Sequence, residues 1–187
     1  MIKTSFNAVR VLMLICLVTV VSGCATPYKA AVDERNMKTI YADEKITFQV
    51  KQAFLDDDQI KYMDYDVASY EGDVFLIGEY TSQAQADKAV NVARSVEGVR
   101  SVTSYLLPKK ELADCGTAEE LELMATIKQK LIQDEDIWST NVDIYMVQCR
   151  AVVLGIVGSE KERSDALAHI RSVKGLKGVK SYLRVKR

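Results

Sequence analysis

The side chains that could support catalysis are few in this 187-residue chain and are scattered along it. The one histidine, His169, is expected on a helix surface, where a partly exposed imidazole needs no chemical role. Two acidic clusters, Asp56–Asp58 and Asp134–Asp136, lack the spaced ligands and turn glycine of a calcium-binding loop. We interpret both as solvated loops, with weak metal binding as the alternative. Since there is also no Gly-rich phosphate loop or nucleophile elbow, the sequence predicts no enzyme activity, metal or cofactor.

The chain begins with a segment typical of secreted proteins. Two basic residues precede an apolar run at 11–21, which is shorter than the ~20 residues that a helix needs to cross a bilayer. The run ends in Val21-Ser22-Gly23-Cys24, which resembles the lipobox of bacterial lipoproteins. This resemblance implies cleavage before Cys24 and lipidation of that cysteine, and Ala25 implies delivery to the outer membrane. An ordinary secretory signal with a chance cysteine is the alternative.

The rest of the chain repeats itself once without a gap, and the repeat defines the elements that must position the other candidates. Residues 46–110 align with residues 123–187, and Gly78 falls on Gly155. Because two copies are too few for a solenoid, the repeat predicts two domains with one fold.

Hydrophobic periodicity predicts the elements of each copy. Apolar residues spaced by four, from Ile46 to Phe54 and from Leu123 to Leu131, form one helix face. Two strands, a second helix and a final strand follow, at 64–70, 73–79, from 82 and at 102–107 in the first copy, and at 141–148, 151–157, from 159 and at 179–185 in the second. The sequence thus predicts an α+β fold, helix-strand-strand-helix-strand, with two helices on one face of a three-stranded mixed sheet.

Residues at the helix ends refine these boundaries. Capping boxes predict helix starts at Thr117 with Glu120, at Ser82 with Gln85 and at Ser159 with Glu162. Gly98 and Gly175 fit the left-handed conformation that stops the second helix of each copy.

Three features of the repeat resemble the BON domain of bacterial periplasmic and outer-membrane proteins. They are the order of elements, the stretch Gly72-Asp73-Val74-Phe75-Leu76-Ile77-Gly78, and the ending Val96-Glu97-Gly98-Val99 before Val102. Two such domains behind a lipobox resemble the dual BON-domain lipoproteins, and the match covers residues 33–187. The resemblance implies a lipid-anchored protein of the outer membrane that faces the periplasm.

The repeat and its charges divide the chain into parts. We expect a signal peptide at 1–23, an anchor-proximal linker at 24–39, tandem BON domains at 40–108 and 117–187, and a linker at 109–116. The first domain holds 6 basic and 12 acidic residues, and the second holds 12 basic and 10 acidic residues. Because the copies differ in charge, we expect a structural first domain and a binding second domain. The linker either permits hinge motion or docks the domains rigidly.

Two cysteines, Cys115 and Cys149, remain in an oxidising compartment once the signal is removed and Cys24 is lipidated. Cys115 precedes the first helix of the second domain, and Cys149 lies in its strand–strand turn. If the strand runs antiparallel beneath the helix, its turn returns to the helix start, because the two elements span about 26 Å and about 22 Å. We therefore predict a structural disulfide, with free thiols or a redox pair as the alternatives.

The basic end of the chain contains a candidate lipid-binding face. Strand alternation places Lys180, Tyr182, Arg184 and Lys186 on one side, opposite Val179, Ser181, Leu183 and Val185. A periplasmic location argues against nucleic acid as the partner, whereas anionic phospholipid headgroups attract surface lysines and arginines. A solvated sheet face is the alternative.

The resemblance supplies a second candidate surface, because the lipid-binding relatives contact anionic phospholipid around the first helix of their second domain. Here that helix, at about 118–132, carries Leu121, Met124, Lys128 and Lys130. The aromatic side chain that assists in those relatives is missing from the helix start. Trp138 follows the helix instead, as either a core or a surface residue.

Two functions are compatible with these features. The first is an outer-membrane lipoprotein whose second domain binds anionic phospholipid or the membrane surface and supports envelope integrity. The second is an adaptor that binds other envelope proteins and uses its lipid only as a tether. In both cases we expect no cofactor and no nucleic-acid partner.

Overall fold

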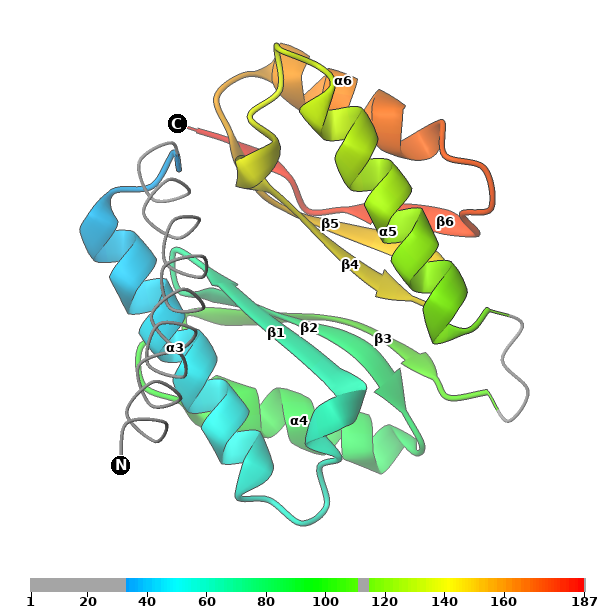
Figure 1. The fold of residues 1–187 in the computed structure, drawn as a ribbon. Helices are drawn as coiled ribbons and strands as arrows, with labels where there is room; N and C mark the ends of the chain where they lie inside the picture. The colour runs from blue at the N-terminus through cyan, green and yellow to red at the C-terminus, as the bar shows by residue number, and fades with distance from the viewer. Residues whose placement is uncertain (1–32, 111–114, 187) are drawn as a thin grey trace, which may run out of the picture. The chain divides into compact units, whose positions relative to one another are not determined.

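The structure is a computed structural model, and it describes residues 33–110 and 115–186 (Figure 1). The expected signal peptide and Cys24 lie outside the described residues. Residues Glu34–Arg187 form one compact unit. None of the described helices has the length and apolarity that crossing a membrane requires.

Each half of this unit contains two α-helices, a short 3-10 helix and a sheet. The first half consists of α3 Met37–Leu55, η1 Tyr62–Asp64, β1 Tyr65–Tyr70, β2 Asp73–Tyr80, α4 Gln83–Ser95 and β3 Ser101–Pro108. The second half consists of α5 Thr117–Ile132, η2 Ser139–Asn141, β4 Val142–Val147, β5 Arg150–Val157, α6 Glu160–Arg171, β6 Gly178–Ser181 and β7 Arg184–Val185. The predicted α+β order of elements is therefore confirmed in both halves.

The two sheets have the same mixed topology. In the first sheet β2 is central, antiparallel to β1 and parallel to β3. In the second sheet β5 is central, antiparallel to β4 and parallel to β6 and β7. The final strand, predicted as one run at 179–185, is divided between β6 and β7. The register continues across the break, because Val153 pairs with Ser181 and Ile156 pairs with Arg184.

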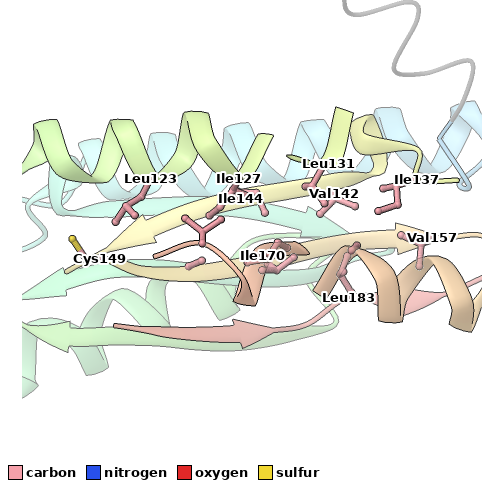
Figure 2. Packing of buried hydrophobic residues seen from close by; sticks show 14 residues of the cluster. Leu123, Ile127, Leu131, Ile137, Val142, Ile144, Cys149, Val157, Ile170 and Leu183 are labelled. Atoms are coloured by element: carbon pink, nitrogen blue, oxygen red, sulfur yellow. The ribbon is translucent and has the colours of Figure 1, made fainter. Parts of the chain in front are cut away.

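The two helices of each half cover one face of its sheet and bury the predicted apolar positions. Val50 and Phe54 are fully enclosed in the first core, and Ile127 is fully enclosed in the second. Figure 2 shows how Leu123 and Leu131 of α5 lie with Ile127 over the second sheet. Each fully buried side chain of this size contributes ~1.5–3 kcal/mol to folding.

The other faces of the two sheets pack against each other. This sheet interface buries Ala68, Tyr70, Phe75 and Ile77 from the first half with Val147, Val152, Leu154 and Ile156 from the second. The unit therefore has four layers, with the two helix pairs outside and the two sheets inside (Figure 1). Of the two arrangements expected for the linker, the structure shows docked domains.

The helix starts follow the predicted capping residues at two of three places. Ser82 accepts a hydrogen bond from the backbone N–H of Gln85, and Ser159 accepts one from Glu162. The predicted Thr117–Glu120 box is wrong. Helix α5 begins after Gly116, whose N–H donates to Glu119 at 2.9 Å, because the Glu120 carboxylate turns toward the strands and accepts from the N–H of Cys149 at 3.1 Å.

Glycines at equivalent positions of the central strands allow a close approach to the neighbouring strand. Gly78 has φ 148° and Gly155 has φ 139°. A Cβ atom at either position would lie 2.0 Å from a backbone oxygen, that of Asp64 or that of Asn141. A side chain here would push the strands apart, which explains why the same residue stands in both copies.

Candidate functional site

The two cysteines of the second half are joined by a disulfide, as the sequence predicts. Cys115 lies just before α5, Cys149 lies in the β4–β5 turn, and their Cα atoms are 5.8 Å apart. The bond closes a sequence separation of 34 residues, which corresponds to about 4 kcal/mol in the chain-entropy description. Since Cys149 is buried within the core cluster, the disulfide is structural.

The basic strand face predicted to bind lipid is turned toward the first half of the unit. Arg184 donates from Nη1 to Asp73 Oδ2 at 3.1 Å and from Nη2 to the Tyr70 carbonyl oxygen at 3.2 Å. Its guanidinium also lies 3.4 Å from Glu71. The residues of the acidic first half therefore neutralise this arginine.

The neighbours of Arg184 on this face are engaged in the same way. The Tyr182 ring packs on Phe75 at a centroid distance of 5.2 Å, and Lys186 forms an ion pair with Glu34 at 2.8 Å. Lys180 is exposed, with its Nζ 5.2 Å from the centroid of the Tyr182 ring. The alternation of the strand holds, and three of the four side chains on this face contact the first half, so these contacts do not support the predicted lipid binding by this face.

Polar contacts fix the orientation of the two sheets. The Tyr70 hydroxyl donates a hydrogen bond to Asp143, and the Gln148 amide donates to Glu79 at 2.7 Å and to the Pro108 carbonyl at 2.9 Å. Burial, together with the charge of Asp143, raises the pKa of Tyr70 well above its usual value. Burial also raises the pKa of Tyr145 and of Tyr182.

The outer face of α5 brings together most of the candidates predicted on that helix. At 3.6 residues per turn, Leu121, Lys128 and Ile132 lie within about 40° of one another, about 120° around the helix from the centre of its buried side. Leu121 and Ile132 are 60% and 69% exposed. Leu121 and Met124 also line a groove of about 350 Å³ between α5 and β4. Lys130 points to another side of the helix, so the structure separates it from this group.

Trp138 lies at the surface, and the interpretation as a core residue is wrong. Its side chain is 51% exposed, while the preceding Ile137 takes the buried position. The Trp138 backbone N–H donates to Glu162 at 2.9 Å, which holds the loop against the start of α6. An exposed tryptophan close to the end of α5 adds an amphipathic side chain of the kind found at membrane–water interfaces.

Sequence reasoning missed a row of exposed apolar side chains on α3. Met37, Tyr41, Phe48 and Leu55 are 64%, 75%, 67% and 63% exposed. Their spacing of four, seven and seven residues places them on one line along the helix, opposite Ile46, Val50 and Phe54. That spacing was visible in the sequence as a second apolar periodicity.

The remaining polar candidates have structural partners. His169 Nε2 lies 2.8 Å from Asp134 Oδ2, and this contact lowers the pKa of the Asp134 carboxyl. Lys88 lies 2.9 Å from Asp57 and lowers the pKa of that carboxyl. Across residues 33–110 and 115–186 no three His, Cys, Asp or Glu side chains are grouped to hold a metal ion.

Two sheets of the same mixed topology, each covered by two helices, define a protein built from one duplicated α+β module. The model of the BON domain matches residues 42–107 and 120–187, so the chain belongs to the BON-domain family. The resemblance to dual BON-domain proteins is therefore confirmed.

Three curated proteins are similar along most of their length. Osmotically-inducible protein Y of Escherichia coli strain K12 is 36% identical over 146 residues, which are 77% of this chain and 73% of that protein. Outer membrane lipoprotein DolP of Haemophilus influenzae is 30% identical over 171 residues, or 91% and 86%. The 21 kDa hemolysin of Actinobacillus pleuropneumoniae is 25% identical over 150 residues, or 79% and 76%.

Proposed function

We propose that this BON-domain protein is a non-enzymatic lipoprotein of the outer membrane that faces the periplasm and contacts anionic phospholipid through its second domain. The lipobox-like Val21-Ser22-Gly23-Cys24 and the similarity to an outer membrane lipoprotein support the anchor and the location. Acyl chains on Cys24 would hold the protein at the membrane, since each buried CH₂ contributes ~0.8 kcal/mol.

The outer face of α5 is the observation that carries the lipid contact. Leu121 and Ile132 are exposed with Lys128 beside them, and the exposed Trp138 lies in the loop six residues after the helix. Within about 60° of this line the helix has no acidic residue, because Thr117, Ala118, Met124 and Ala125 fill the remaining positions. An apolar row with a lysine and a nearby tryptophan is typical of a helix that lies on an anionic membrane surface.

Liposome flotation tests this proposal. The chain from residue 25 onward should float with phosphatidylglycerol vesicles at low salt and dissociate as salt is raised. Changing Leu121, Lys128 and Trp138 together to Ala should abolish flotation, because these substitutions remove both the apolar and the charged contact. Phe48→Ala on α3 is the matched control and should float like the unchanged chain. Absence of flotation on every anionic vesicle would exclude this function.

The alternative function, a tethered adaptor, is favoured by a separate observation. The row on α3 belongs to the helix layer on the far side of the sheets from α5, so a protein that contacts lipid through α5 leaves α3 facing away. The two functions are compatible with each other, because lipid contact by α5 leaves the exposed row on α3 available to bind a protein.

A further inference from the structure

Helix α3 has two amphipathic faces, and only one of them is covered by the fold. The inner face buries Ile46, Val50 and Phe54 against the first sheet. The outer face presents the row Met37, Tyr41, Phe48 and Leu55, each more than half exposed. Isolated exposed apolar residues are ordinary, but four on one line along a single helix mark an interaction surface.

The spacing of this row is that of a helix–helix seam. Tyr41, Phe48 and Leu55 are seven residues apart, and Met37 stands four residues before Tyr41. Tyr41, Phe48 and Leu55 are thus successive a positions of a heptad and Met37 is a d position, while Glu44 and Lys51 hold the other two d positions. Apolar contact with a second helix would therefore be made mainly by the a positions. From Met37 to Leu55 the row extends about 27 Å, which a partner helix of about five turns would cover.

The charges along the row distinguish a helical protein partner from a membrane. Glu44 lies on the same line, between Tyr41 and Phe48, so an anionic bilayer would have to accept a carboxylate in the middle of the contact. The equivalent position on α5 is Leu121. A partner helix can place a basic group opposite Glu44.

Lysines determine the net charge of the outer face of α3. Lys38 and Lys45 flank the row and are exposed, and the half-buried Lys51 lies about 60° around the helix from Phe48. Against Glu44 within the row and the exposed Asp56 after Leu55, these three lysines leave the surface with one net positive charge, although the first domain as a whole is acidic. The complementary helix therefore carries carboxylates next to its apolar positions.

A second copy of the chain is a poorer occupant than a different protein. A symmetric pairing of two α3 helices would set the lysines of one copy against those of the other.

We propose that the outer face of α3 is a docking surface for an amphipathic helix of another envelope protein, with apolar residues at heptad spacing flanked by carboxylates. This inference goes beyond lipid contact by α5 and does not require it. It requires only that the partner can reach the compartment in which the chain is anchored.

Site-specific photo-crosslinking of the full, lipid-anchored chain in its host cells tests the inference. A benzophenone amino acid replaces Tyr41, Phe48 or Leu55, in separate variants. The same group at Ala42, on another side of α3, and at Ala125, on the outer face of α5, provides matched controls. Mass spectrometry then maps the residue that each crosslink reaches.

The expected result is one protein partner for all three α3 positions. The mapped residues should be spaced by about seven within one predicted helix and flanked by Asp or Glu, and the two controls should not reach that segment. Reversing Lys38 and Lys45 to Glu should lower the crosslink yield about tenfold, and changing the mapped acids to Lys should restore it. The same reversal leaves flotation through α5 unchanged, which separates this inference from the proposed function.

Four other outcomes would overturn the inference. They are crosslinks to lipid, crosslinks to a second copy or to residues 25–32 of the same chain, crosslinks to a protein segment without heptad spacing and acidic flanks, and no crosslink above the Ala42 control.

Discussion

Helices α3 and α5 occupy equivalent places in the two copies, yet their outer faces differ in kind. Their inner faces are alike because the same sheet must be covered in each half. On the outside, α3 presents large apolar side chains interrupted by Glu44, whereas α5 presents Leu121 and Ile132 with Ala125 and Lys128 between them. The fold therefore constrains one face of each helix and leaves the other free to acquire a separate partner.

The strand–strand turns show a second difference between the copies. The first turn is Glu71-Gly72 and the second is Gln148-Cys149, and all four residues have positive φ. Glycine adopts this conformation without steric cost, but cysteine does not. The disulfide to Cys115 offsets this cost. The second domain therefore has a less favourable turn conformation than the first, together with a covalent link that the first lacks at this turn.

Removing this link should have the largest effect on stability. The double change Cys115→Ser with Cys149→Ser should lower the free energy of unfolding by about 4 kcal/mol, because the unfolded chain regains the entropy of the closed loop. Urea denaturation with and without reductant measures it. Cys115→Ser with Cys149→Gly is the control and should lose less, since glycine relaxes the turn. Equal stability of oxidised and reduced protein would show that the link is dispensable.

The contact between the sheets should be the next most sensitive feature. Arg184→Ala removes charge-assisted hydrogen bonds to Asp73 and to the Tyr70 carbonyl, and should cost about 2 kcal/mol. Lys180→Ala on the same strand should change the free energy of unfolding by less than about 0.5 kcal/mol, because Lys180 is exposed. If both variants unfold at the same denaturant concentration, the basic strand does not hold the domains together.

A smaller effect is expected at Tyr70. Tyr70→Phe leaves Asp143 without the hydroxyl that donates to it, which should cost about 1 kcal/mol. Combining this change with Asp143→Asn tests whether the two residues act as a pair, because their effects should then be less than additive. Full additivity in denaturation experiments would argue against the contact.

Alkaline pH should weaken the fold through two buried tyrosines, Tyr65 and Tyr70, which begin and end β1. The pKa of Tyr65 is raised to about 12, chiefly by burial, and the pKa of Tyr70 is raised well above 10. A group with a raised pKa in the folded state stabilises fully below its unfolded pKa, near 10, and the stability is lost as pH rises through the folded value. Urea unfolding between pH 8 and about 12 should show a steady fall above 10, and a smaller fall for Tyr70→Phe.

The sequence predicts the fold well because the repeat supplies each pattern twice. The turn at Gly72 and the helix stop at Gly98 are local signals, and each has a counterpart at the same offset. The fate of the basic strand could not be predicted in this way. A row of lysine, tyrosine and arginine suits either lipid headgroups or acidic side chains, and the acidic partner Asp73 lies far away in sequence.

The two helix surfaces were predictable to different degrees. Resemblance pointed to α5, but only the structure separates Lys130 from Leu121 and places Trp138 at the surface. On α3, the sequence pattern predicts the core face formed by Ile46, Val50 and Phe54. The exposed apolar row lies in the same segment of sequence and has its own regular spacing. A helix with apolar residues on two faces therefore predicts a core contact on one face and a second contact on the other.

Parallel flotation of two single variants tests the division between α5 and α3 most directly. Leu121→Glu and Phe48→Glu each place a carboxylate on the outer face of one helix, at sites that are both more than half exposed. On phosphatidylglycerol vesicles, Leu121→Glu should lose flotation and Phe48→Glu should keep it, while both variants unfold at the same urea concentration. Loss of flotation by Phe48→Glu with retention by Leu121→Glu would contradict the assignment of lipid to the second domain.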